Sequence, residues 1–205
     1  MIDPSIIVDG AKRIWEMIPE DFLDWSKSEV LNFIQRKLPD FFNFCKGKIS
    51  ALWARITNKK AKEAVDTATS NILFLNDQIP LDIKKNLFER ITGSQYNPDT
   101  NMTTQDLTEI IQTDEEKKAA AMQMAYLMAV LGQINQKQEA MVNEYVSALK
   151  ITEELRREIE NELLEAEKEF ARFAEELRRL DDEFKRTSSE TAKAKKEASD
   201  IIDLI

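Results

Sequence analysis

An unbroken heptad pattern runs through the last quarter of the chain. No glycine or proline follows Thr152, and apolar residues recur at alternating steps of four and three. This spacing is typical of a coiled-coil seam, so it predicts one long helix with a single apolar stripe. About 50 helical residues would span roughly 75 Å. The seam comprises Ile159, Leu163, Ala166, Phe170, Phe173, Leu177, Leu180, Phe184, Thr187, Thr191, Ala194, Ala198, Ile201 and Ile205.

The seam changes character along its length. Its residues are large and often aromatic over 159–184, and small or polar over 187–198. We expect the first half to pack onto the rest of the protein. The second half is expected either to fray or to bind a partner that supplies the missing apolar surface. The predicted partner-binding residues are Phe184, Thr187, Thr191, Ala194, Ala198, Ile201 and Ile205.

Composition extends the helical prediction to the whole chain. Only 4 glycines and 5 prolines occur among 205 residues, which favours long helices over turn-rich sheets. The predicted fold class is all-α, a helical bundle with a long C-terminal coiled-coil-like helix. Three segments are expected: an aromatic and basic helical segment at 1–60, a helical core at 61–150 and the long amphipathic helix at 151–205.

Apolar spacing and capping residues predict the individual helices. Two prolines, Pro19 and Pro39, are expected to end the first two helices, and Gly93 is expected to close another. Thr113 with Glu116 forms a capping box that opens an apolar helix, and Thr152 caps the last one. The predicted helices are 6–18, 30–38, 41–56, 61–75, 81–91, 104–112, 115–131, one after Asn135, and 153–205.

The segment 41–62 carries six basic residues and no acidic one, with phenylalanine and tryptophan among its apolar positions. The preferred interpretation is a core helix with a basic polar face, because aromatic helix faces mostly pack inside proteins. The alternative is a helix lying on an anionic membrane. For that alternative the predicted membrane-surface residues are Phe41, Phe42, Lys46, Lys48, Trp53 and Arg55.

Residue counts exclude several kinds of chemistry. The chain has no histidine, which removes Ser-His-Asp and Cys-His nucleophiles and histidine-ligated metals. The single cysteine, Cys45, excludes an intramolecular disulfide and is expected to be a buried apolar residue. Glutamates interleave with arginines at helical spacing, which is typical of a solvated face. No catalytic residue, metal ligand or cofactor is therefore predicted.

The net charge of the chain limits which classes of partner are expected. The formal net charge is −9, so nucleic acid is not an expected partner. A protein partner or a homo-oligomer is expected instead. No apolar run reaches the 18 residues of a membrane-spanning helix, and the N-terminus lacks the pattern of a secretory signal. The expected location is cytoplasmic, at an anionic membrane surface if the basic helix is interfacial.

Two turns between helices carry a family resemblance. The sequence Ala-Val-Leu-Gly-Gln-Ile-Asn-Gln-Lys-Gln-Glu at 129–139, followed by Ser-Ala-Leu-Lys-Ile-Thr at 147–152, is similar to the TerB family of tellurite-resistance and stress-associated helical domains. A second copy of the turn is Asn-Asp-Gln-Ile-Pro-Leu-Asp-Ile at 76–83. The resemblance implies an internally duplicated helical domain of about 90 residues.

The chain departs from that family where metal ligands would lie. Leu131 and Gln138 stand at the family's acidic positions in one turn, and Asn76 and Ile83 stand there in the other. The resemblance therefore implies a TerB-like scaffold without the family's metal site. Gly132, Ile134 and Ile79 keep the positions that shape and anchor the turns.

Together these features predict a non-enzymatic interaction or scaffold protein. It would hold a protein partner, or associate with itself, through the long C-terminal helix. The alternative is a peripheral membrane protein of the stress response, anchored by the basic aromatic helix at 41–58.

Overall fold

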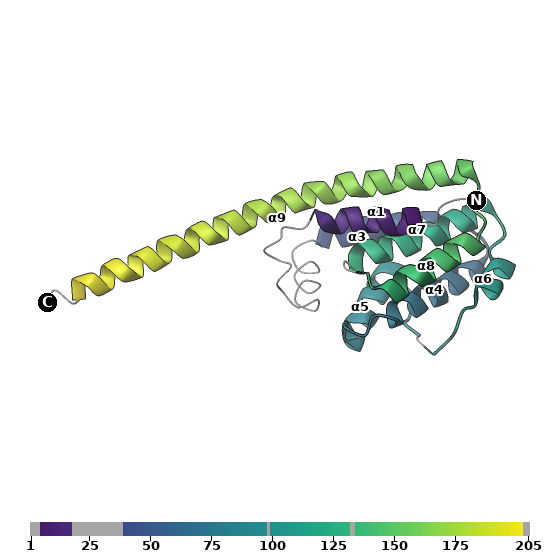
Figure 1. The fold of residues 1–205 in the computed structure, drawn as a ribbon, viewed down its shortest axis with the longest axis horizontal. Coiled ribbons are helices and arrows are strands. Elements are labelled where there is room, and N and C mark those ends of the chain that lie inside the picture. Colours follow the sequence, from purple (N-terminus) through teal and green to yellow (C-terminus); the bar gives the residue numbers. More distant parts are fainter. Residues whose placement is uncertain (1–4, 18–38, 98, 132–133, 203–205) are drawn as a thin grey trace.

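The protein, seen in a computed structural model that describes residues 5–17, 39–97, 99–131 and 134–202, is a helical bundle with a long protruding helix (Figure 1). The described residues form α1 (Ser5–Glu16), α3 (Pro39–Trp53), α4 (Lys59–Phe74), α5 (Leu81–Thr92), α6 (Thr104–Ile110), α7 (Asp114–Leu131), α8 (Gln136–Ala148) and α9 (Glu153–Ile202). They contain no strand. The predicted all-α class and its long C-terminal helix are confirmed.

Most predicted helices appear within a few residues of their expected bounds. The predicted helix 41–56 is α3, which begins and ends earlier, at Pro39 and Trp53. Gly93 closes α5 as predicted and adopts a φ of 72°, a left-handed conformation that glycine reaches without steric cost. The predicted helix 30–38, the stop at Pro19 and the turn at Gly132 lie outside the described residues.

Side-chain caps begin several helices. The predicted box at α7 is present, because Glu116 N donates to Thr113 Oγ1 and Thr113 N donates to Glu116 Oε2. Thr152 caps α9 as predicted, accepting from the amide of Leu155. A further box joins Asn135 and Gln138 at the start of α8. These contacts satisfy amide groups that helix geometry leaves without partners.

Helix α7 is the centre of the bundle. Nearly every residue from Ala119 to Leu131 is buried, and α1, α3, α4, α5 and α9 all pack against it. Alanines along α7 allow this close approach on several sides. The methionines Met122, Met124 and Met128 are completely buried, so they fill the core. One hydrophobic core contains residues from all three segments predicted from the sequence.

Helix α1 lies between α7 and α9. A Cβ atom placed on Gly10 would lie 3.1 Å from Cδ1 of Leu163, so this glycine allows α1 and α9 to approach closely. Ile7, Ala11 and Ile14 are all completely buried. Helix α1 is therefore part of the bundle core.

Candidate functional site

The first part of α9 is packed against the bundle. We call residues 153–174 the proximal segment of α9. Its seam residues Ile159, Leu163, Ala166, Phe170 and Phe173 are at most 8% exposed, and this segment contacts α1, α3 and α7. The prediction that the large-residue half of the seam packs onto the protein is confirmed over these residues.

An aromatic cluster joins α3 to this segment. The ring of Phe41 meets Phe170 edge-on with centroids 4.7 Å apart, and its centroid lies 6.2 Å from that of Phe173. Such edge-to-face pairs add to the gain from burying the rings. The cluster fixes α9 close to the point where it leaves the bundle.

Ion pairs flank the buried seam on both sides. Arg13 of α1 lies 2.7 Å from Glu167, and Lys118 of α7 lies 2.9 Å from Glu158. Lys48 of α3 contacts both Glu162 and Glu165. Partial burial lowers the pKa of Lys48, but hydrogen bonds and charge attraction from the two glutamates outweigh it and raise the pKa overall. Three bundle helices thus each hold α9 through a cation.

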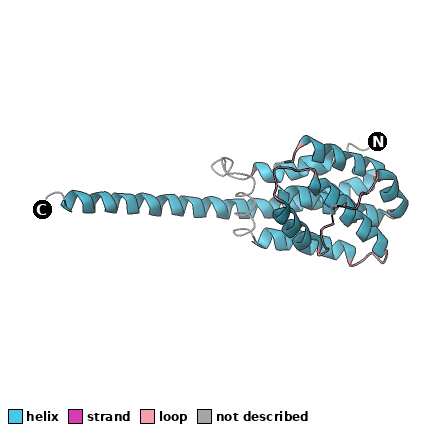
Figure 2. Cartoon of the chain, turned by 90° about the horizontal axis from the view of Figure 1, so that it is seen from below, coloured by secondary structure: helices cyan, strands magenta, loops and turns pink. Residues whose placement is uncertain are grey.

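The remainder of α9 runs beyond the bundle as a single rod (Figure 2). We call residues 175–202 the distal segment. The backbone positions of Phe184, Thr187, Thr191, Ala194, Ala198 and Ile201 all lie on it. Ile205, the last predicted partner-binding residue, lies outside the described residues.

The predicted membrane-surface residues are divided between core and surface. Phe41, Phe42 and Trp53 are 0%, 2% and 6% exposed, so their rings pack inside the bundle. This corrects their assignment to a membrane-facing surface, because their apolar area is already removed from water. The core interpretation of this helix is the one that the structure supports.

The basic members of that set have different environments. Lys48 is engaged with α9, as described above, whereas Lys46 and Arg55 are exposed. Arg90 of α5 lies over the ring of Phe42, 4.9 Å from its centroid. The polar face of α3 is therefore basic, as the sequence indicated, but its apolar face belongs to the core.

A buried polar network links α3, α4 and α7. Trp53 Nε1 donates to Oε1 of Gln123 across 2.7 Å, and Nε2 of Gln123 donates to Asp66 across 2.8 Å. Lys62 pairs with the same carboxylate at 2.6 Å. Sequence reasoning missed this network; its one signal was a glutamine within the Ala/Met-rich stretch of α7. With its partners satisfied, the network stabilises the core.

The two turns that carry the TerB resemblance meet inside the protein. Asn76 Nδ2 donates to Oε1 of Gln138 across 3.1 Å, and both side chains are completely buried. Gln138 also donates to the carbonyl of Ile72. Among the described residues no group of three or more Cys, Asp or Glu side chains is arranged to hold a metal ion. Amides at these positions connect α4 to α8.

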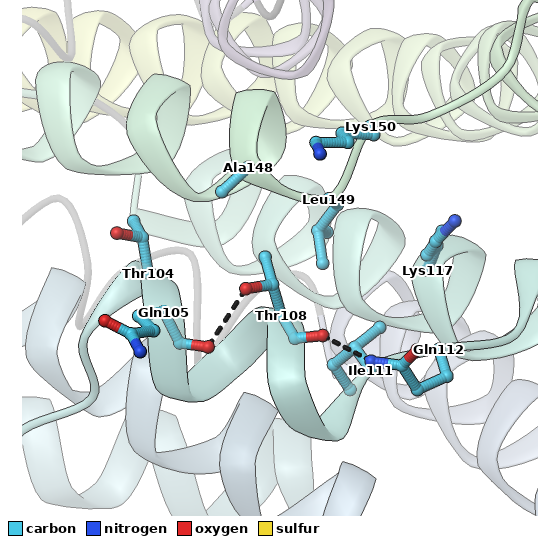
Figure 3. Close-up of a pocket in the computed structure, with 9 residues that line it drawn as sticks. All are labelled: Thr104, Gln105, Thr108, Ile111, Gln112, Lys117, Ala148, Leu149 and Lys150. Carbon is cyan, nitrogen blue, oxygen red and sulfur yellow. Dashed lines mark hydrogen bonds between the residues drawn. The ribbon is translucent and has the colours of Figure 1, made fainter.

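A groove between α6, the start of α7 and the end of α8 has a volume of about 570 Å³ (Figure 3). The groove is lined by Thr104, Gln105, Thr108, Ile111, Gln112, Lys117, Ala148, Leu149 and Lys150. Thr108 Oγ1 donates to the carbonyl of Gln105, and Gln112 donates to the carbonyl of Thr108. These hydrogen bonds lie within α6 and the turn that follows it.

Cys45 lies in the core, completely buried. Burial raises the pKa of its thiol far above neutral pH, which keeps the sulfur protonated. The expectation of a buried apolar cysteine is confirmed.

Comparison with known proteins gave no relative. No family model, curated protein sequence or solved structure matches the chain. Among the described helices, none is sufficiently long and apolar to cross a membrane.

Proposed function

We propose that the chain is a non-enzymatic interaction protein that binds another helix through the distal segment of α9. The bound helix belongs to a protein partner or to a second copy of the chain. A TerB-like bundle, with Leu131, Gln138, Asn76 and Ile83 at the family's acidic positions, serves as the scaffold that carries this helix. The proposal is one of binding, and it assigns no reaction to the bundle.

One observation carries the proposal. The heptad seam is buried against the bundle as far as Phe173, and the same spacing continues along a helix that extends about 42 Å further. Leu177, Leu180 and Phe184 follow in this register. An apolar stripe on an isolated helix gains free energy when a second helix covers it.

A truncation tests the proposal. We would compare the intact chain with a chain that ends at Lys185, using light scattering for self-association and affinity capture for protein partners. The intact chain is expected to show at least one association that the truncated chain lacks. Thermal unfolding of the bundle is the control, and it should be the same for both chains. Identical masses and identical captured proteins would contradict the proposal.

A further inference from the structure

We propose that the distal segment binds the distal segment of a second copy, in antiparallel orientation, with Phe184 of one copy facing Thr187 of the other. This inference rests on the proposed function and names a second copy of the chain as the partner. It follows from the order of large and small residues, and of acidic and basic blocks, along a helix whose backbone continues to Ile202.

Size complementarity is the first argument. In this alignment the seam residues from Leu177 to Ala194 of one copy meet those of the other. The layers are Leu177 with Ala194, Leu180 with Thr191, and Phe184 with Thr187, each formed twice by symmetry. Every layer then joins a large side chain to a small one, which is how facing helices fill space without voids.

A parallel pair in register lacks this property. Each seam residue would meet its own copy, so Ala194 would face Ala194 and Ala198 would face Ala198. Small residues facing each other leave unfilled space or too little buried apolar area. The large side chains of the seam would not be packed against the small ones. The residue order therefore favours the antiparallel arrangement.

Charge order is the second argument. Residues 175–183 contain five acidic and two basic side chains, whereas residues 188–196 contain one acidic and three basic side chains. The antiparallel alignment places these oppositely charged blocks beside each other, and the parallel one places like beside like. The distal segment, 175–202, contains eight acidic and seven basic residues, a net charge of −1, although the chain as a whole carries −9. Two copies can thus approach through this segment with little net repulsion.

One flank of the seam bears a regular column of glutamates, which the antiparallel pair would bring together. Three of its four members in the distal segment are followed three residues later by an arginine or a lysine on the same helix, and the fourth, Glu197, is followed by Asp200. These pairs are Glu176 with Arg179, Glu183 with Arg186, and Glu190 with Lys193. In the described part, Glu169 and Arg172 have this spacing and register and lie 3.3 Å apart. The same pairing along the distal segment would balance Glu176, Glu183 and Glu190 within each copy.

The arrangement suits the shape of the molecule. An overlap from Leu177 to Ala194, which leaves Phe173 packed in the bundle, extends about 27 Å, or two and a half heptads. Because the bundle lies at the proximal end of α9, the two bundles would be at opposite ends of the shared rod (Figures 1 and 2).

Site-directed cross-linking tests the orientation. Leu180→Cys and Thr191→Cys would be made in two separate, differently tagged chains, which are then mixed and oxidised. The native thiol of Cys45 is completely buried and does not compete. The proposal predicts a cross-link between the two variants and little within either one. Ser189→Cys, half a turn away from the seam on α9, is the matched control and should cross-link with neither.

A second variant tests in solution whether pairing of large with small side chains stabilises the dimer. Leu177→Ala would leave two Ala–Ala layers, so the dimer dissociation constant should rise more than about tenfold. Ser189→Ala should leave the constant unchanged. Sedimentation of the intact chain over a range of concentrations gives these values without any cysteine variant.

The outcomes separate this inference from the proposed function. Cross-links of Thr191→Cys with itself would overturn the antiparallel orientation. A chain that stays monomeric at high concentration and forms no cross-link would overturn self-association. If that monomer still captured another protein through residues 186–205, the proposed function would stand and the partner would be a different protein.

Discussion

The amide of Asn76 donates a hydrogen bond to the side chain of Gln138, 62 residues later in the chain, across 3.1 Å. Neither side chain is exposed to solvent. Oε1 of Gln138 also accepts from the backbone of Asn135, and its Nε2 donates to Ile72. The buried side chain of Gln138 thus satisfies three polar groups: the carbonyl of Ile72 in α4, the side-chain amide of Asn76 after α4, and the backbone amide of Asn135 before α8.

Replacing this glutamine should destabilise the bundle. Gln138→Leu would leave the amide of Asn76 buried without a partner, whereas the carbonyl of Ile72 would keep the backbone amide of Leu75 as its donor. An unpartnered buried polar group costs about 1–3 kcal/mol, so we expect a loss of about 2 kcal/mol in the free energy of unfolding. Urea denaturation measures it. Gln136→Leu, at an exposed position of the same helix, is the control, and equal losses for both variants would contradict the structural role assigned here.

Two glycines in helices should respond differently to alanine. Nothing lies within 4 Å of a Cβ placed on Gly47, whereas one on Gly10 would lie 3.1 Å from Leu163. Gly47→Ala should raise the free energy of unfolding by about 0.5–1 kcal/mol, because alanine costs less backbone entropy in a helix. Gly10→Ala should gain less or lose stability, since Leu163 must move. Equal gains in thermal unfolding would show that α1 and α9 are not in close contact.

Acid should remove the contribution of Glu116. Burial raises the pKa of this carboxyl, but amide donors from Thr113, Gln112 and Asn58 outweigh that effect and lower the pKa below its ordinary value of 4.5. A lowered pKa in the folded state contributes stability above about pH 4.5, and that contribution is lost as pH falls through the folded-state pKa.

The Glu116→Gln variant isolates this contribution. It should be about 1–2 kcal/mol less stable than the parent at pH 7, and the difference should shrink towards pH 3, where the carboxyl of the parent is protonated. Denaturation with urea at several pH values measures the difference. Glu115→Gln, at the exposed neighbouring position, is the control. A difference that does not depend on pH would contradict the role of the ionised carboxylate.

The intact chain should not sediment with anionic lipid vesicles, even at low salt. Phe41, Phe42 and Trp53 would have to leave the core before they could enter a membrane, and each buried aromatic ring would lose several kcal/mol of packing. Exposed Lys46 and Arg55 add only a weak, screened attraction. Strong co-sedimentation that depends on Phe42 and Trp53 would show instead that α3 leaves the bundle at a membrane.

Local signals along the chain predicted much of this fold. Thr113 with Glu116 and Thr152 both cap helices where the sequence placed them, because a cap depends on residues only three positions apart. The heptad spacing and the large seam residues also predicted that the first part of the seam packs onto the protein. The apolar face of α3 was also predicted, although a helical period cannot say whether other helices or a membrane cover it.

Contacts between distant residues were beyond such reasoning. Trp53 with Gln123 joins residues 70 positions apart, and no periodicity links a tryptophan in one helix to a glutamine in another. The ion pairs of Lys48 and Lys118 with α9 likewise depend on how the helices pack. The sequence predicted that the distal segment is helical. Its partner is proposed from the order of residue sizes and charges along that helix.

The attachment of α9 also determines where its far end points. The helix extends about 42 Å past its last described buried seam residue, so a tilt of 5° at that residue moves the tip by about 4 Å. Arg13, Lys48 and Lys118 hold the opposite end. Adjustments of a few tenths of an ångström in these ion pairs would therefore be magnified severalfold at the tip, and the rod acts as a lever arm whose aim the bundle controls.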